Sequence, residues 1–402
     1  MPSRPAVAAA FLAGVLVLAA KAPDALRTPQ FWAEDGVVFF VPQHASSVPL
    51  LFEPHAGYLH FLPRLTAWAA SGFSAVHAPL IYNLAALLFG AAALASLRQL
   101  DRLGLGFALA LAPVLLAPTN GEVWGTITNV QWLMQFYLVS MLARLFQGGG
   151  EDFAPVPRAA AAFAVGLTGP FSIFAVLSAS VGLLWLRWRA GPLQRVRSAG
   201  VSLEWTVLGL CAALQALLIV TTANTDTPPV AFSLDVALGL VKSVQVHVFG
   251  AQWMPVLLFP IALLALLAFV LRRSTAPQQA IVVATALFSV SQMVAVAHSR
   301  TDQFQQVASF GFGDRYYFLF KMAFWWLVAV AMVRAAPPRS HLPAIVLFVA
   351  LGCNALAMPN AFQRQPLRDL HWADYARRID AGEALDVPIN PVSWQIHVPA
   401  EH

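Results

Sequence analysis

Long apolar runs, separated by short stretches that carry arginine, make up most of the chain up to residue 358. A helix that crosses the hydrocarbon core of a bilayer needs about 20 mostly apolar residues. Nine runs approach that length: 5–22, 76–97, 103–118, 129–146, 203–222, 253–271, 278–297, 315–333 and 341–358. The pattern predicts an all-α polytopic membrane protein. The first run could pass for a signal peptide, but the many spans after it favour an uncleaved helix.

The stretch 159–187 is too long for one span and is interrupted at Thr168-Gly169-Pro170. Basic residues flank it on both sides, with Arg158 before it and four arginines within 187–197 after it. We therefore predict two shorter helices that turn at Gly169-Pro170, since such a break is tolerated where protein covers it. This brings the total to about eleven segments in a membrane domain over residues 1–358.

Charge is sparse, and its placement predicts the orientation. Charged residues make up 11% of the chain, against about 25% in ordinary soluble proteins. The basic loops hold Arg98, Arg102, Arg158, the 187–197 cluster, Arg272, Arg273, Arg334 and Arg339. The alternate loops, 119–128 and 223–252, contain only Lys242. Positive residues favour the cytoplasmic side, so we expect the N-terminus inside and the C-terminus outside.

The net charge of +5 would suit nucleic acid only if the basic residues formed one surface. They fall instead as short clusters between apolar runs, so we expect no nucleic-acid partner. The two cysteines, Cys211 and Cys353, both lie inside apolar runs and imply no disulfide framework.

The outer side is predicted to carry two long polar segments. The first outer loop, 23–75, is long for a compact protein, and long ordered loops are commonly functional. Its stretch 58–73 mixes aromatic, basic and apolar residues, which is typical of a helix lying in the membrane interface. The tail 359–402 is too short for an independent domain, and we expect it to pack over the outer face.

Two adjacent carboxylates, Glu34 and Asp35, stand in this loop, in a chain with only 19 acidic residues. They follow Trp32, which suits the lipid–water boundary, and precede Gly36, which allows a tight turn. The pair could act as a general base or as a ligand of a divalent cation. Alternatively, it is an acidic loop that merely keeps this segment out of the bilayer.

The arrangement resembles the GT-C superfamily of membrane glycosyltransferases, which use polyprenyl-phosphate-linked sugars. The residues that carry the resemblance are Trp32-Ala-Glu-Asp-Gly36, His55-Ala-Gly-Tyr-Leu-His60 with Arg64, Asn120-Gly-Glu122, Asn129-Val-Gln-Trp132 and Gly313-Asp-Arg-Tyr-Tyr317. The chain lacks the large soluble C-terminal domain and the Trp-Trp-Asp signature of the oligosaccharyltransferase branch.

The resemblance implies a bacterial inner-membrane enzyme whose active site faces the periplasm. It would move a sugar from a polyprenyl-phosphate donor to a lipid, glycan or protein acceptor. The resemblance also implies that Asp35 is the base or a metal ligand and that Glu34 is its partner, with Mg²⁺ or Mn²⁺ as a candidate cation. Of the two acids we favour Asp35, because the adjacent Gly36 would leave room for close approach.

The leaving phosphate needs a cation, and Arg315 is the best candidate, with Arg64 and Lys242 next. Arg315 begins a span beside Tyr316 and Tyr317, where a guanidinium can bind phosphate through two hydrogen bonds. The alternative is an arginine that simply reaches from a helix end to the interface. Lys321 lies two turns deeper, so it either reaches outward in the same way or pairs with an acid.

Further candidates for the substrate cavity are His55, His60, Glu122, Tyr316 and Tyr317. A histidine at the interface could assist as acid, base or phosphate donor, although a lone histidine commonly plays a structural role. Glu122 and Asn129 could line the cavity or could cap the fourth segment, with Asn129 or Thr128 as the N-cap. Two other functions share this hydropathy: a transporter or flippase of lipid-linked glycans, and a non-catalytic binding protein of the same family. A transporter should place ionisable residues midway along several spans.

Overall fold

The computed structural model describes residues 4–147, 154–190, 203–222, 233–252, 254–299, 313–337, 340–357 and 361–400. Most of these residues are helical, and five helical stretches are long and apolar enough to cross a membrane. They are 75–103, which contains α5(Ala78–Ser96), then α9(Phe171–Ala190), α10(Leu203–Thr222), 276–297 of α13(Ala276–Ser299), and α15(Asp314–Ala335). The prediction of a mostly helical protein with helices apolar enough to span a membrane is confirmed. The number of eleven spans and their orientation stay predictions.

Shorter helices complete the bundle. They are α1(Arg4–Lys21), α6(Phe107–Leu116), α7(Val130–Gln147), α8(Pro155–Gly166), α11(Leu234–Phe249), α12(Leu258–Arg272) and α16(Leu342–Ala357). Most lie within a few residues of the predicted runs. The exception is α11, which occupies part of the predicted loop 223–252. Its buried face, which includes Val244 and Val248, packs on α15 and α12, while Lys242 is exposed.

The predicted break at Thr168-Gly169-Pro170 is confirmed. α8 ends at Gly166 and α9 begins at Phe171, and Gly169 between them has a φ of +88°, which favours glycine. The N–H of Phe61 donates to the carbonyl of Leu167, and the N–H of Gly169 donates to the carbonyl of Leu59. The break is therefore covered by the first loop, which satisfies the backbone groups that it frees.

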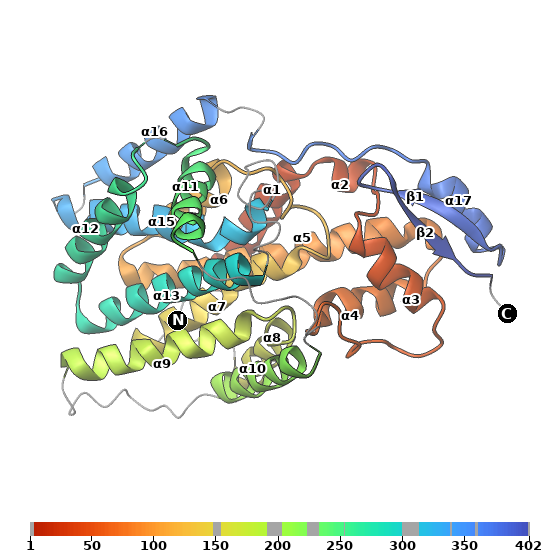
Figure 1. Ribbon diagram of the computed structural model, residues 1–402, viewed down its shortest axis with the longest axis horizontal. Helices are drawn as coiled ribbons and strands as arrows, with labels where there is room; N and C mark the ends of the chain where they lie inside the picture. The colour runs from red at the N-terminus through yellow and green to blue at the C-terminus, as the bar shows by residue number, and fades with distance from the viewer. Residues whose placement is uncertain are drawn as a thin grey trace.

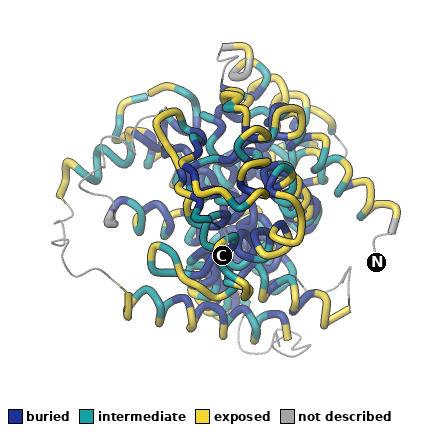
Figure 2. The backbone as a smooth tube through the Cα atoms, turned by 90° about the vertical axis from the view of Figure 1, so that its right-hand side faces the viewer, coloured by how far each residue is buried: buried dark blue, intermediate teal, exposed yellow. Residues whose placement is uncertain are grey.

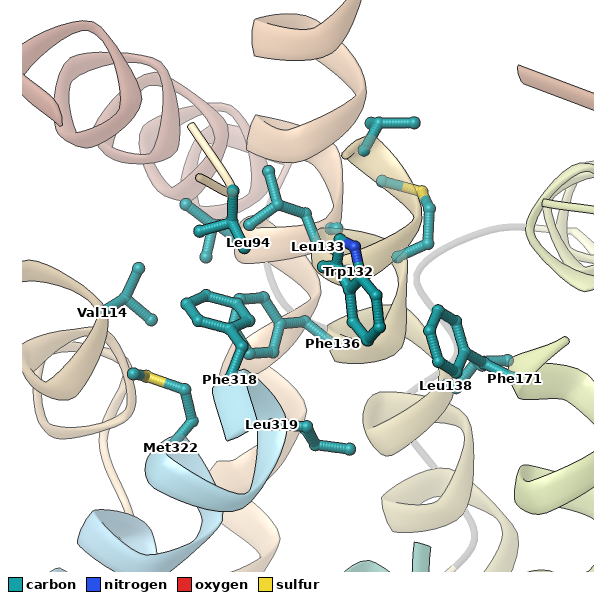
Figure 3. Packing of buried hydrophobic residues seen from close by; sticks show 14 of the residues in the cluster. Leu94, Val114, Trp132, Leu133, Phe136, Leu138, Phe171, Phe318, Leu319 and Met322 are labelled. Atoms are coloured by element: carbon teal, nitrogen blue, oxygen red, sulfur yellow. The ribbon is translucent and has the colours of Figure 1, made fainter. Parts of the chain in front are cut away.

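The core lies where α5, α7 and α15 meet (Figure 3). Leu94 of α5, Phe136 of α7 and Phe318 of α15 are fully buried there, and the rings of Phe136 and Phe318 are 5.4 Å apart. Figure 2 shows the buried backbone at the centre and exposed residues toward the outside. Many of those exposed residues are leucines, such as Leu210 and Leu264, which suits helices that face lipid.

Basic residues gather at one end of the bundle. The carbonyl of Arg102 accepts from Gln147 of α7 and Gln278 of α13, and Arg273, after α12, donates to the carbonyl of Arg334 of α15. The first loop and the C-terminal tail lie together at the opposite end (Figure 1). The turns around Arg102, Arg273 and Arg334 thus lie at the end of the bundle opposite the acidic pair.

The first loop is largely ordered into short helices. These are α2(Asp24–Arg27), the π-helix η1(Asp35–Phe40), α3(Val41–His44) and α4(Phe61–Ala70), followed by the turn η2(Ala75–His77). α4 falls within the stretch 58–73 that was predicted to be helical, and it packs on α5, α8 and η1. The predicted tight turn at Gly36 is wrong: the positive φ belongs to Ala33, at 39°, and Gly36 lies inside η1.

The tail forms α17(Trp372–Ile379) and an antiparallel hairpin of β1(Leu385–Ile389) and β2(Trp394–Val398). It packs directly on the first loop. The ring of Trp372 contacts those of Phe31 and Phe40, and its indole N–H donates to the carbonyl of Ala75. A buried ion pair joins Arg364 to Asp24. These contacts connect the C-terminal segment to the segment that holds Asp35.

Candidate functional site

Asp35 is fully buried and is held by one residue of a distant segment. Its Oδ1 accepts two hydrogen bonds from Thr128, one from the hydroxyl at 2.6 Å and one from the backbone N–H at 2.8 Å. Its Oδ2 is also buried but has no hydrogen-bond partner among the described residues. The carboxylate is thus fixed in orientation and has one oxygen available to accept a proton.

Burial raises the pKa of Asp35 from 3.8 to about 7, because removal from water disfavours the charged form. The two hydrogen bonds from Thr128 oppose this shift, and the charge of neighbouring Glu34 adds to it. A carboxyl group with this pKa exchanges its proton near neutral pH, which suits a general base or acid.

Glu34 has a different environment from that of its neighbour Asp35. Its side chain is half-buried, and it lies close enough to His55 and to Arg315 to act on both electrostatically. Glu34 is the accessible member of the pair, and Asp35 is the buried one.

The space beside Gly36 is already filled. A Cβ atom at this position would lie 3.0 Å from Cδ1 of Ile389 and 3.2 Å from Cγ2 of Ile396. The glycine therefore admits the hairpin of the tail. The expectation that it leaves room for a substrate beside Asp35 is wrong.

The start of α7 connects Asp35 to the start of α15. Thr128 lies two residues before α7, and Trp132 in the first turn of α7 packs edge-to-face on Tyr316, with ring centroids 5.5 Å apart. Glu122 accepts hydrogen bonds from the N–H groups of Gly313 and Arg315. Glu122 thus caps the N-terminus of α15, where the helix dipole favours a negative charge. The expectation that it caps the fourth segment is wrong, because its partners belong to α15.

Arg315 lies beside these groups at the beginning of α15. Its guanidinium donates to the hydroxyl of Tyr316 at 3.2 Å and lies 3.9 Å from a carboxylate oxygen of Glu122. Its side chain is 23% exposed, so part of it can reach a ligand. Arg315, Tyr316, Glu34 and Glu122 therefore form one partly accessible cluster next to the segment of Asp35.

The other two candidate phosphate ligands lie elsewhere. Arg64 is buried, donates to the carbonyl of Val38 at 2.9 Å, and stacks over the ring of Phe39. This arginine holds the π-helix that begins at Asp35. Lys242 lies on the exposed face of α11, and no contact joins it to the Asp35 segment within the part of the chain that the structure describes.

His55 and His60 of the first loop form a ring cluster with Tyr58. His60 stacks on Tyr58, with centroids 4.6 Å apart, and lies 5.7 Å from the ring of His55. Burial lowers the pKa of His60 to about 3, so this ring is neutral at physiological pH. Burial also lowers the pKa of His55. Neither histidine is placed to supply a positive charge to a phosphate.

A second polar cluster, which the sequence analysis did not find, is buried inside the bundle. Asp314 accepts from the Nζ of Lys321 at 2.8 Å and from the hydroxyl of Thr119, and it contacts Nδ1 of His247 at 2.9 Å. The ring of His247 stacks on Tyr317. Of the two alternatives for Lys321, the structure supports the pairing with an acid. Tyr317 belongs to this cluster, and Tyr316 belongs to the cluster of Arg315.

Glu34 and Asp35 are the donors that were predicted for a divalent cation. Among the described residues, no group of three or more His, Cys, Asp or Glu side chains is placed to hold a metal ion. One oxygen of Asp35 is already occupied by the two hydrogen bonds from Thr128. These donors do not fit a resident Mg²⁺ or Mn²⁺, which requires several oxygen ligands in regular geometry. The reaction proposed for this site uses no metal.

Comparison of the chain with protein-family models, with curated proteins and with solved structures found no match.

Proposed function

We propose that the protein is a membrane glycosyltransferase that moves a sugar from a polyprenyl-phosphate donor to an acceptor hydroxyl. One observation carries this proposal: Asp35 is a buried carboxyl group, oriented by Thr128, with a free Oδ2 and a pKa of about 7. Such a group is costly to bury, and strongly perturbed carboxyl groups are concentrated at catalytic sites. The acceptor is a lipid, glycan or protein.

In the proposed reaction, Oδ2 of Asp35 takes the proton of the acceptor hydroxyl. The acceptor oxygen forms a bond to the anomeric carbon as the bond between that carbon and the phosphate oxygen breaks. The electron pair of the broken bond stays on the phosphate, and polyprenyl phosphate leaves. Asp35 then returns its proton to water. Because Asp35 is fully buried, the acceptor must approach past Glu34, the accessible acid of the pair.

Arg315 is the proposed partner of the leaving phosphate. It is partly exposed, lies at the start of a span, and is near Glu34. A planar guanidinium can bind phosphate through two parallel hydrogen bonds and neutralise its charge as the bond breaks. Arg64 does not fit this role, because its guanidinium already holds the backbone of Val38.

The proposed setting is a bacterial inner membrane, crossed about eleven times, with residues 23–75 and 359–402 on the periplasmic side. The turns around Arg102, Arg273 and Arg334 lie at the end of the bundle opposite the acidic pair. This placement supports the proposed orientation. Fusions of a topology reporter after Arg102 and after the last residue should read inside and outside. If both fusions read inside, the proposed orientation would be contradicted.

The experiment uses the full chain in lipid nanodiscs and a panel of polyprenyl-phosphate sugars with labelled sugar. We expect release of polyprenyl phosphate from at least one donor. Arg315→Lys keeps the charge but loses the two-point contact, so release should fall at least about 10-fold. The matched control is Arg187→Lys, at the exposed end of α9. If Arg315→Lys is as active as the parent, Arg315 is only an interfacial anchor.

The buried cluster of Asp314, Lys321 and His247 favours a second candidate, a transporter, because ionisable residues inside membrane helices commonly mark a transport path. All three lie at one place near the start of α15, and the predicted transporter pattern requires such groups on several spans. Flux of a lipid-linked glycan across vesicles without release of polyprenyl phosphate would favour the transporter.

A further inference from the structure

A cavity of about 190 Å³ lies between α12, α13 and α15, next to the turn at residues 97–103. Its lining is almost entirely apolar and includes Leu103, Leu267, Ala286 and Phe324. Only Thr285 and Ser289 contribute hydroxyl groups. For comparison, an apolar protein cavity of about 150 Å³ is large enough to bind benzene. This cavity can therefore hold a segment of hydrocarbon chain, and none of its residues belongs to the site around Asp35.

The cavity opens toward the outside of the bundle. Two of its lining residues are exposed, Leu264 to 64% and Val290 to 39%. Leu257 and Ile261 extend the exposed apolar face along α12. In a helix bundle that spans a membrane, such a face contacts lipid, so an acyl chain can enter the cavity from the side.

Two arginines lie at the end of the cavity. Arg273 follows α12, and its guanidinium donates to the carbonyl of Arg334 near the end of α15 at 3.2 Å. The guanidinium of Arg334 approaches the carbonyl of Leu103, which lines the cavity, at 3.4 Å. Among the described residues, the two guanidinium groups donate to backbone carbonyls and to no carboxylate, and the buried Nε of Arg334 has no partner. Two positive charges thus stand beside an apolar slot without an acid to neutralise them.

We infer that this cavity binds one acyl chain of an anionic glycerophospholipid, whose phosphate lies against Arg273 and Arg334. The distance between the cavity and the arginines allows one lipid to contact both. The cavity residue Val330 precedes Arg334 by one helical turn, about 6 Å, so the chain and the headgroup contacts are continuous. Basic pockets between membrane helices are suited to acidic lipid headgroups.

This lipid site is distinct from the proposed donor site. Arg315 and Arg334 stand at opposite ends of α15, about 28 Å apart at 1.5 Å per residue. A lipid whose phosphate lies at Arg334 therefore belongs to the leaflet opposite the acidic pair. The inference does not depend on the proposed glycosyl transfer.

The test is native mass spectrometry of the full chain in detergent, with phosphatidylglycerol and phosphatidylcholine of identical acyl chains. We expect the parent to prefer phosphatidylglycerol at least fivefold, since each basic residue near an anionic lipid is worth about that factor. Arg273→Gln should reduce the preference about fivefold. The matched control, Arg187→Gln, removes the same charge from the end of α9 and should leave the preference unchanged.

A second pair of variants tests the cavity. Ala286→Trp should fill it and reduce binding of phosphatidylglycerol, whereas Leu210→Trp, on the exposed face of α10, should bind as the parent does. Equal affinity of the parent for the two lipids would overturn the inference. So would an Ala286→Trp variant that retains as much phosphatidylglycerol as Leu210→Trp.

Discussion

Asp35 accepts both a hydroxyl and a backbone hydrogen bond from Thr128, a residue 93 positions away in the sequence. The first loop and the start of α7 are joined at this point. The pairing leaves Oδ2 as the one carboxylate oxygen without a partner among the described residues, and it therefore determines which atom of Asp35 can take a proton.

Thr128→Val tests this relationship through pH dependence. The hydroxyl bond lowers the pKa of Asp35, so its loss should raise that pKa above 7. A base must be ionised, so the proposed transfer rate should rise with pH through about 7 in the parent and through a higher pH in Thr128→Val. At pH 7 the variant should be slower. The control, Thr126→Val, removes a hydroxyl that accepts from Asn129 and should leave the profile unshifted.

Asp35→Asn should make the folded protein more stable at high pH. The pKa of Asp35 is higher in the folded state than in the unfolded chain, so its ionisation costs stability in full above pH 7 and nothing below pH 4. A shift from 3.8 to about 7 corresponds to about 4 kcal/mol, an upper figure for the gain. Thermal unfolding of Asp35→Asn and of the parent, in detergent at pH 5 and pH 8, measures this gain in stability. A gain that does not grow with pH would contradict the raised pKa.

Gly36→Val should loosen the tail. The added side chain would meet Ile389 and Ile396, which pack within about 3 Å of where its Cβ must lie. Limited proteolysis should then cut the tail faster than in the parent, and the proposed activity should fall because η1 is displaced. Gly209→Val is the control, since no atom lies within 4 Å of its added Cβ. Equal tail protection in the two variants would mean that the hairpin does not depend on Gly36.

The apolar runs predicted most helices because a membrane span is long and its signal is summed over many residues. The break at Gly169-Pro170 was also predicted from local sequence, because the run is too long for one span and these residues interrupt it. The helix α11 was missed because Asp235, Lys242 and His247 interrupt its apolar run. Its buried face is covered by α12 and α15, and this covering cannot be predicted from the residues of α11 alone.

The candidate site could be predicted in part. The adjacent acids stood out because acidic residues are rare in the chain. Their separation into a buried Asp35 and an accessible Glu34 depends on Thr128 and on the tail, which are distant in sequence. Asp314 was missed as a site residue because its partners come from three separate segments. The sequence signal was available: a lysine two turns inside a span needs an acid nearby.

The most direct test of the account is the release of polyprenyl phosphate by purified Asp35→Asn protein, measured beside the parent and Glu34→Gln at pH 7 in nanodiscs. Asparagine is nearly isosteric and can keep the bonds from Thr128, but it cannot take the proton. We predict a rate about 100-fold or more below that of the parent, with a smaller loss for Glu34→Gln. Turnover by Asp35→Asn at the rate of the parent would contradict the assignment of Asp35 as the base.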